Sequence, residues 1–515
     1  MAELGFWNFA SQNPEPLALV DPNLKEWSRG ELLAETNKIA HGLRSLGLTR
    51  GDCVAIVMEN SAEFFQIYLA VTQIGLYLTP INNHLTGPEI AYIIKDSDAK
   101  VFFGSARFKP ACVAAREELD FPQGHSFSLG AVPGFRALEE LKHGQPEGLP
   151  EERSAGQVMN YTSGTTGRPK GVRRPLVDIS PDLVATLTTG FLGMFGVQPE
   201  DDNVHICGSP LYHTAVLMFS GSSMHMGHTV VLMEKWLPEE MLRLIEKYRV
   251  THSHMVPTQF HRLLKLDEKI RSQYDMSSLR TMVHAAAPCP METKRKMLDW
   301  WGDAIFEYYA ATEGGGTLVT PQEWRKYPGT VGKAWTNSDI KIYDEDENEL
   351  GPNQVGTVYM LLGQADFKYK DAEKKTRDNR IGNYFTVGDV GELNDEGYLF
   401  LRDRKTDMII SGGANLYPAE IESELIQHPK VADVAVFGIP NDDWGEEIKA
   451  VIQPMDGVEA TENLTDEIFS WCESRLAKMK TPRSIDYVVE LPRDPNGKLY
   501  KRKLRDPYWE GRSQI

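Results

Sequence analysis

The stretch Y-T-S-G-T-T-G-R-P-K-G at residues 161–171 contains the residues of this sequence that are best suited to bind an anion. Glycine lets backbone N–H groups turn toward a ligand without steric cost, hydroxyl groups donate further hydrogen bonds, and lysine supplies a positive charge. We therefore predict a loop that holds the phosphates of a nucleotide, with the ligands Thr162, Ser163, Gly164, Thr165, Thr166, Gly167 and Lys170.

The order of residues in this loop argues against two other interpretations. A flexible surface loop is also rich in glycine and threonine, but a string of this length and order is rare by chance. A P-loop needs four residues between its first glycine and a Gly-Lys-Ser/Thr triplet that opens a helix. Here Gly164 and Gly167 are three positions apart and Pro169 precedes the lysine, which excludes a P-loop. Apolar or small residues flank the loop, so we expect it to join two strands.

Further motifs that contain candidate catalytic residues lie later in the chain. The segment 308–313 reads Y-Y-A-A-T-E and ends in a carboxylate. The segment 384–389 reads Y-F-T-V-G-D and is predicted to be a strand with Asp389 at its tip. Arg404 lies in a charge-dense stretch, and Lys498 ends the run L-P-R-D-P-N-G-K. Carboxylate oxygen is a ligand that Mg²⁺ prefers, and lysine and arginine stabilise phosphate charge.

Taken in this order, the motifs resemble those of the adenylate-forming superfamily, which includes acyl-CoA synthetases, stand-alone adenylation domains and luciferases. The resemblance covers nearly the whole chain, because the motifs follow one another in the family order. It implies that ATP activates a carboxylic acid as an acyl adenylate, which a thiol then attacks.

The resemblance also implies roles for residues of the nucleotide site. Tyr309 would stack on adenine, Asp389 would accept hydrogen bonds from the ribose hydroxyls, and Arg404 would be the second ribose ligand. Glu313 would hold Mg²⁺, and Lys498 would contact the substrate carboxylate and the transferring phosphate. The same match adds Ala286, Ala287 and Pro288 on the adenine side, Tyr308 beside Tyr309, and Thr312 at the phosphates. The residues expected to act in catalysis are Lys498, Glu313, Thr166 and Arg404.

Acyl and CoA sites follow from the same match. The residues expected to line the acyl pocket are Tyr212, His213, Ala310 and Ala311, and those expected to face CoA are Gly412, Gly413 and Trp444. Ala310 stands where the family usually has glycine, so its methyl group is expected to reshape one wall of the acyl pocket. Structural alternatives stay open: His213 bonded to a carbonyl at a turn, residues 283–288 as a tight turn after a strand, and Trp444 as a cover of a small core.

Alternating strands and helices predict an α/β fold with doubly wound mixed sheets in a large N-terminal domain. A helix is expected at 28–46, where Ser28 and Glu31 can form a capping box, and strands are expected at 53–58 and 76–80. Residues 122–154 are interpreted as an irregular connection.

Two domains are predicted, at 1–403 and 404–515. The first would bind ATP and the carboxylate, and the second would be a small, mobile α+β domain that carries Lys498 and the CoA-facing loop. Thr406 matches the family's hinge position, where lysine or aspartate is more usual.

Composition limits the classes of partner. The chain has 515 residues and a net charge of −18, which argues against binding nucleic acid through a general basic surface. Its five cysteines are scattered without a C-x-x-C pair, as expected for a cytoplasmic protein in a reducing compartment. Neither a signal peptide nor a transmembrane segment is evident.

The histidines at 225, 228, 252 and 254 form no recognisable metal motif and are interpreted as structural or solvated. The sequence leaves open whether the chain forms a homodimer.

The function predicted from these motifs is that of an acyl-CoA synthetase, an ATP-dependent acid–thiol ligase that uses Mg²⁺ and CoA. The alternatives are an adenylating enzyme whose acceptor is the phosphopantetheine of a carrier protein, a luciferase, and a non-catalytic AMP-binding protein. The presence of Glu313, Asp389, Arg404 and Lys498 together argues against the last of these. The sequence does not identify the acid substrate. Fatty, aryl, alicyclic and steroid side-chain acids are all compatible with these motifs.

Overall fold

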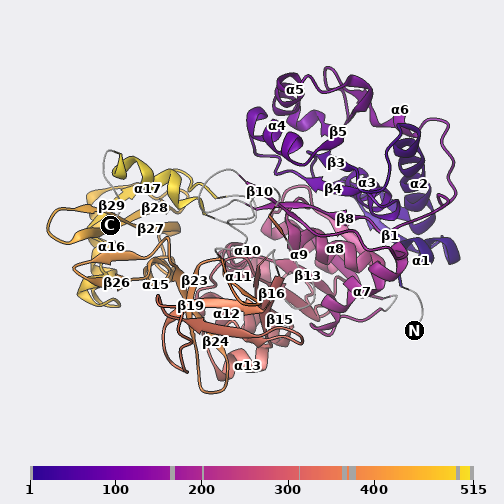
Figure 1. The fold of residues 1–515 in the computed structure, drawn as a ribbon. Coiled ribbons are helices and arrows are strands. Elements are labelled where there is room, and N and C mark those ends of the chain that lie inside the picture. Colours follow the sequence, from indigo (N-terminus) through magenta and orange to yellow (C-terminus); the bar gives the residue numbers. More distant parts are fainter. Residues whose placement is uncertain are drawn as a thin grey trace. The chain divides into compact units, whose positions relative to one another are not determined.

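The structure is a computed structural model, drawn as a ribbon in Figure 1. It describes residues 4–162, 169–199, 202–311, 314–361, 368–369, 379–493 and 499–510. Contacts divide the chain into two compact units. Unit 1 comprises Met1–Met255, Leu266–Val283 and Gln364–Asp378, and unit 2 comprises Val256–Lys265, His284–Gly363 and Asn379–Ile515.

The first sheet of unit 1 is parallel, with the strand order β7-β6-β5-β3-β4-β8. Helices cover both of its faces: Val54 and Ile56 pack with α2 and α3, whereas Ala55, between them, packs with α4 and α5 (Figure 1). This doubly wound arrangement confirms the predicted fold class. The elements are β3 (Cys53–Ile56), β4 (Tyr77–Pro80), β5 (Ala99–Ser105), β6 (Ser126–Leu129), β7 (Arg136–Ala137), β8 (Gln157–Val158), α2 (Arg29–Ser45), α3 (Ala62–Gln73), α4 (Gly87–Asp96), α5 (Lys109–Glu118) and α6 (Leu138–Lys142).

Local sequence signals explain several boundaries. Helix α2 begins after Ser28, whose hydroxyl accepts from the backbone N–H of Glu31 while the Glu31 carboxylate accepts from Ser28, so the predicted capping box is present. The prediction of an irregular connection at 122–154 was wrong in part, because β6, β7 and α6 lie within it. These elements are too short to show a clear hydrophobic period in the sequence.

A second sheet of unit 1 runs in the order β2-β1-β12-β11-β13-β14; β1, β12, β11 and β13 are parallel, and β1 and β2 form an antiparallel hairpin. Its core is continuous with that of α2 and α3, since Leu19, Val230 and Leu232 belong to the same hydrophobic cluster. The elements are β1 (Leu17–Val20), β2 (Glu26–Ser28), β11 (Val204–Cys207), β12 (Thr229–Leu232), β13 (His252–Met255), β14 (Thr281–His284), α1 (Phe6–Gln12), α7 (Pro181–Gly193), α8 (Thr214–His225), α9 (Pro238–Tyr248) and α11 (Glu268–Arg271). A small antiparallel sheet adds β9 (Asn160–Thr162), β10 (Lys170–Arg173) and β20 (Lys368–Tyr369).

The first part of unit 2 contains antiparallel strands. Strands β15, β16 and β17 are adjacent, and another sheet has the order β21-β22-β19-β23-β24 with β18 paired to β19. The elements are α10 (Pro257–Leu264), α12 (Met291–Trp301), α13 (Pro321–Lys326), β15 (Ile305–Ala311), β16 (Gly314–Val319), β17 (Lys333–Ala334), β18 (Ile340–Tyr343), β19 (Gly356–Leu361), β21 (Arg380–Ile381), β22 (Tyr384–Phe385), β23 (Asp389–Leu393) and β24 (Leu399–Arg404).

The last part of unit 2 is an α+β arrangement with its own core, formed by apolar residues such as Ile421, Val436, Ile452 and Ile468. The sheet order is β26-β25-β28-β27, with β29 paired to β28. Helix α15 begins at Pro418, as the sequence predicts, because proline is well suited to the first helical position. The elements are β25 (Ile409–Ser411), β26 (Ala414–Leu416), α15 (Pro418–Leu425), β27 (Val431–Asn441), β28 (Gly445–Pro454), α16 (Glu462–Glu473), β29 (Ser484–Tyr487) and α17 (Lys501–Trp509).

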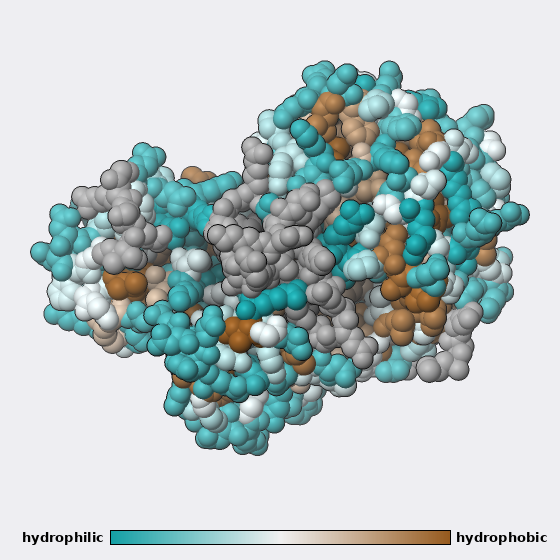
Figure 2. Space-filling view, viewed as in Figure 1, coloured by the Kyte–Doolittle hydropathy of each residue, from teal (hydrophilic) through white to brown (hydrophobic). Residues whose placement is uncertain are grey.

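The surface is largely polar on the face drawn, and the cysteines are unpaired. Polar side chains cover most of the face seen in Figure 2. All five cysteines are free thiols, so no disulfide closes any part of the chain. Among the residues that the structure describes, no helix is both long enough and apolar enough to cross a membrane.

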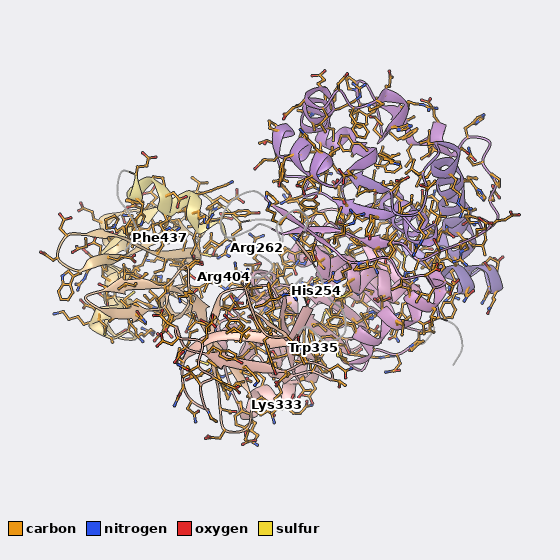
Figure 3. All side chains as sticks on the ribbon, viewed as in Figure 1. His254, Arg262, Lys333, Trp335, Arg404 and Phe437 are labelled. Carbon is orange, nitrogen blue, oxygen red and sulfur yellow. The ribbon has the colours of Figure 1, made fainter. Side chains whose placement is uncertain are left out.

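Histidines are buried in unit 1 around β11, β13 and α8. His205 shares a hydrogen bond of 3.1 Å with the Ser220 hydroxyl, and His252 shares one of 2.8 Å with Ser223. Burial lowers the pKa of His205 and of His254 (labelled in Figure 3) to about 3, and it lowers the pKa of His252 well below its usual value. Within the described ranges, no group of three histidine, cysteine or acidic residues is arranged to hold a metal. We therefore interpret these histidines as neutral members of the core.

These histidines predict that the protein loses stability in mild acid. The unfolded chain binds protons near the ordinary histidine pKa of about 6.5, whereas the folded chain binds them only at much lower pH, so the unfolding free energy falls as pH falls below about 6.5. At pH 5 each such histidine lowers this free energy by up to about 2 kcal/mol. Denaturant unfolding at pH 7.5 and pH 5 measures the loss. His205→Gln should reduce the loss and His84→Gln, at an exposed site, should not; equal stability at the two pH values would contradict the interpretation.

Candidate active site

The predicted phosphate loop connects two antiparallel strands. Strands β9 and β10 pair Thr162 with Lys170 and Tyr161 with Gly171, which confirms that the loop joins two strands. The predicted loop ligands Ser163, Gly164, Thr165, Thr166 and Gly167 lie outside the described residues, and of Thr162 only the backbone is described.

Helix α4 contacts both ends of this loop. The Tyr161 hydroxyl donates to Oδ2 of Asp96 at 2.7 Å, and the Tyr92 hydroxyl donates to the carbonyl of Pro169 at 3.1 Å. Burial and the hydrogen bond to Asp96 raise the pKa of Tyr161. A Cβ added to Gly171 would lie 3.0 Å from the Tyr161 ring, so glycine leaves room for this ring to cross the strand pair. The ends of the loop are thus fixed by contacts that the sequence analysis did not identify.

Three of the predicted nucleotide ligands meet in unit 2. The Tyr309 hydroxyl donates to Oδ2 of Asp389 at 2.6 Å, and Nε of Arg404 (labelled in Figure 3) lies 3.3 Å from Oδ1 of the same carboxylate. Asp389 and Arg404 are also directly paired residues of β23 and β24. Asp389 is buried, whereas the Arg404 side chain is 43% exposed and can also reach a ligand. The structure therefore brings together a carboxylate, an aromatic ring and a guanidinium group.

The backbone around Asp389 differs from the prediction. The segment 384–389 was expected to be one strand that ends at Asp389, but β22 ends at Phe385 and Asp389 is the first residue of β23. Gly388, between them, has a φ of 86°, in the left-handed region that favours glycine. Its N–H donates to the Thr386 hydroxyl at 3.0 Å. The turn, rather than the end of a strand, orients the carboxylate.

The segment expected on the adenine side follows β14 directly. Ala286 has a φ of 72°, which is rare for a residue with a side chain and costs of the order of 1–3 kcal/mol. Ala286 and Pro288 are exposed, and Ala287 is half-buried. A buried ion pair between Lys294 and Glu307 joins α12, the helix that follows this segment, to β15. Strained backbone held between fixed elements is typical of a ligand-contacting turn.

The four residues assigned to the acyl pocket fall on two segments, one before α8 and one at the end of β15. Tyr212 is buried, its ring lies 4.4 Å from that of His213, and His213 directly precedes α8. Asn60 fixes this segment, because its Nδ2 donates to the carbonyl of Ser209 and its Oδ1 accepts from the N–H of Leu211. In unit 2, Ala310 and Ala311 are half-buried at the end of β15, and Tyr308 is buried before them.

The residues predicted to face CoA have an unusual contact. Gly412 and Gly413 have φ values of 57° and 81°, and the N–H of Gly412 donates to the carbonyl of Trp444 at 2.8 Å. A Cβ on Gly412 would lie 2.5 Å from the Trp444 ring, so the ring lies directly over the glycine. Trp444 is 58% exposed. More than half of the Trp444 surface therefore faces solvent.

The remaining assigned residues are only partly described. Thr406 lies in the turn between β24 and β25, where the N–H of Asp407 donates to the carbonyl of Arg404 at 2.9 Å. Thr312, Glu313 and Lys498 lie outside the described residues, so their roles stay predictions.

Comparison with known proteins identifies the family. A family model of AMP-binding enzymes matches residues 6–362, and one of the AMP-binding enzyme C-terminal domain matches residues 420–498. The chain is 32% identical to the long-chain-fatty-acid–CoA ligase FadD13 of Mycobacterium tuberculosis, over 97% of both chains. It is 29% identical to the fatty acid–[acyl-carrier-protein] ligase ScoC of Streptomyces coeruleorubidus, over 93% of this chain and 91% of ScoC. The Bacillus subtilis o-succinylbenzoate CoA synthetase MenE, solved with an acyl-adenylate intermediate, aligns with a TM-score of 0.81 at 26% identity, over 98% of each chain.

The chain belongs to the family of AMP-binding enzymes, whose members form acyl adenylates. It is an acid–thiol ligase of the acyl-CoA synthetase type, with ATP and CoA as substrates. The predicted function, enzyme class and fold class are confirmed at this level.

The Tyr309–Asp389 contact predicts a specific effect on the use of ATP. Tyr309→Phe keeps the ring but removes the hydroxyl that orients the carboxylate, and a hydrogen bond to a charged group contributes about 1.5–3 kcal/mol. We expect kcat/KM for ATP to fall about tenfold, with the KM for the acid changed less than twofold. Tyr384→Phe is the matched control, because it removes a hydroxyl that donates to Asp339 at the same distance of 2.6 Å. Equal effects of the two substitutions would place the nucleotide elsewhere.

Proposed function

We propose that the cluster of Tyr309, Asp389 and Arg404 holds the adenosine of ATP while a carboxylic acid is converted to its CoA thioester in two steps at one site. In the first step a carboxylate oxygen bonds to the α-phosphorus of ATP, and the bond to pyrophosphate breaks. In the second step the CoA thiolate bonds to the acyl carbon, and AMP leaves with the oxygen that joined it to the acyl group. The observation that carries the proposal is the shared Asp389 carboxylate.

The first step is mainly a problem of positioning and charge. The loop with Ser163, Thr165 and Thr166 would bind phosphate oxygens through hydroxyl and backbone N–H groups, and Thr312 would contact the same phosphates. Lys498 would place a positive charge between the substrate carboxylate and the α-phosphate, which otherwise repel one another. The loop ends, which are fixed by Asp96 at Tyr161 and by Tyr92 at Pro169, support this role for the loop.

Mg²⁺ is proposed to bind through Glu313. The chemistry of the residue fits, because Mg²⁺ binds carboxylate and phosphate oxygens. Glu313 follows β15, the strand that carries Tyr309, so a metal there would lie on the same strand end as the proposed nucleotide site. When bound, Mg²⁺ would neutralise phosphate charge.

The second step requires a route for CoA. We propose that Trp444 and the glycines beneath it form the surface over which CoA passes, which the exposure of the ring supports. Residues 404–515 would turn as a domain about Thr406, so that the acyl adenylate meets Lys498 in one arrangement and the CoA-facing loop in the other.

The acid is proposed to have an apolar body, because the residues that the resemblance assigns to its pocket include Tyr212, Ala310 and Ala311, whose side chains are aromatic or methyl groups. FadD13 is named for long-chain fatty acids and MenE for an aryl acid, so both shapes occur among similar proteins. ScoC is named for a carrier-protein acceptor, which keeps that acceptor as the alternative to test.

An acid panel tests this proposal. AMP release is measured with fatty acids of increasing length, aryl acids and a short dicarboxylic acid, with CoA, with a phosphopantetheine carrier protein, and with neither. We expect kcat/KM to be at least tenfold higher for an apolar acid than for the dicarboxylic acid, and CoA to be the better acceptor. Ala310→Gly should change the ranking of the acids, whereas Ala460→Gly, at an exposed loop position, should not. A preference for the dicarboxylic acid or for the carrier protein would refute the proposed specificity.

A further inference from the structure

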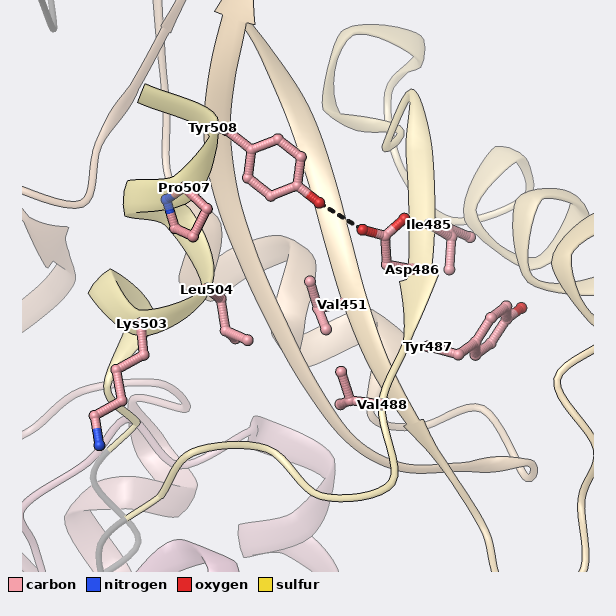
Figure 4. A pocket seen from close by; sticks show the side chains of 9 residues that line it. All are labelled: Val451, Ile485, Asp486, Tyr487, Val488, Lys503, Leu504, Pro507 and Tyr508. Atoms are coloured by element: carbon pink, nitrogen blue, oxygen red, sulfur yellow. Dashed lines mark hydrogen bonds between the residues drawn. The ribbon is translucent and has the colours of Figure 1, made fainter. Parts of the chain in front are cut away.

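Helix α17 connects the segment of Lys498 to the rest of the small domain, because it begins at Lys501. None of its residues is fully buried, although Leu504 packs against a cluster that includes Phe437 and Val451, and the Tyr508 ring lies 6.1 Å from that of Phe437. A hollow of about 620 Å³ lies where α17 meets the sheet, between Val451 and Val488 on one side and Leu504, Pro507 and Tyr508 on the other (Figure 4). The hollow limits the apolar packing of α17, so polar contacts also contribute to its position.

Polar contacts to the sheet occur near the end of the helix. The Tyr508 hydroxyl donates to Oδ2 of Asp486 at 2.6 Å (Figure 4), and Nε1 of Trp509 donates to the carbonyl of Gly438 at 3.1 Å. These contacts fix the end of α17 that is distant from Lys498 in sequence.

The beginning of the helix is held by Lys501. Its Nζ lies 2.9 Å from Oε1 of Glu422 in α15, and the Lys501 side chain is only 13% exposed. Burial alone would lower its pKa, but the carboxylates of Glu422, Asp403 and Asp407 outweigh burial and raise it. Asp403 also accepts from the N–H of Ala419 at 2.8 Å, so Lys501 belongs to a group of charges at the end of β24 and the start of α15. A buried cation with several carboxylates resists displacement, because leaving those carboxylates without it is costly.

Arg505, one helical turn further on, contacts the proposed hinge residue. Its Nη1 donates to the carbonyl oxygen of Thr406 at 3.2 Å. This oxygen lies in the rigid peptide plane that joins Thr406 to Asp407, so rotation about ψ of Thr406 carries it together with the residues that follow. The bond to Arg505 can therefore persist while the domain turns, and it ties α17 to the first peptide plane of the moving part.

From these contacts we propose that Lys501 and Arg505 are positioning residues, which make α17 a strut between the hinge and Lys498 and thereby deliver Lys498 to the nucleotide site during adenylation. The proposal rests on the proposed role of Lys498. Loss of either cation should therefore slow adenylation but not thioester formation. The reason is that Lys498 is proposed to act only on the carboxylate and the α-phosphate.

The test measures the two half-reactions separately in the full-length enzyme. Adenylation is followed as pyrophosphate release in a single turnover, and thioester formation is followed from supplied acyl-AMP and CoA. Arg505→Ala is expected to slow adenylation at least tenfold and thioester formation less than twofold. Arg505→Lys, which keeps a donor, should recover adenylation to within about threefold of wild type. Arg502→Ala, at an exposed position of the same helix, should leave both rates unchanged.

Lys501 is tested by a pair of variants that separates positioning from stability. Lys501→Met leaves the Glu422 carboxylate unpaired and should lower the unfolding midpoint. Adding Glu422→Gln removes that charge and should restore the midpoint while adenylation stays slow. Recovery of adenylation together with stability would show a merely structural role and overturn the proposal, as would equal slowing of both half-reactions by Arg505→Ala.

Lys498→Ala, measured in the same assays, separates the proposed role of Lys498 from the proposed role of α17. If it slows only adenylation while Arg505→Ala leaves the ratio of the half-reactions unchanged, the strut is wrong and the role of Lys498 stands. If Lys498→Ala slows both half-reactions equally, the proposed role of Lys498 fails, and the strut fails with it.

Discussion

The carboxylate of Asp389 is the constraint on which the proposed nucleotide site depends. It is buried, and a buried carboxylate is costly unless donors and positive charge surround it. Here one oxygen accepts from Tyr309 and the other faces Arg404, so the carboxylate joins β15, β23 and the end of β24. Arg404 is two residues before the proposed hinge at Thr406. An adenosine bound to this cluster would therefore contact the strand on which the turning domain begins, and this links nucleotide binding to the proposed rotation.

Polar contacts also fix two other segments that are proposed to take part in the reaction, the predicted phosphate loop and helix α17. Tyr161 and Tyr92 fix the ends of the phosphate loop through α4, and Lys501 and Arg505 fix α17 through charged and backbone groups. Such contacts are directional, so they set the position of a segment more narrowly than apolar packing does.

Local sequence patterns predicted much of the fold, but they could not predict the contacts that orient the site. The capping box at Ser28, the helix that starts at Pro418 and the hairpin around the phosphate loop each follow from signals within a few residues. The contacts of Tyr161 with Asp96 and of Tyr309 with Asp389 join residues that are 65 and 80 positions apart, and no local period encodes them. The start of β23 at Asp389 was missed because a glycine in the left-handed region divides what looks like one strand. Family resemblance supplied the identities of the predicted ligands, which composition and periodicity could not.

The most direct test of this account is whether Asp389 recognises the ribose hydroxyls. Equilibrium affinities for ATP and for 2′,3′-dideoxy-ATP are measured with the wild-type enzyme and with Asp389→Asn, after equal unfolding midpoints confirm that both are folded. Hydrogen bonds to a carboxylate predict that the wild type prefers ATP by roughly 10- to 100-fold. The account predicts that Asp389→Asn reduces this preference at least fivefold. An unchanged preference in Asp389→Asn would contradict the placement of the ribose at this carboxylate.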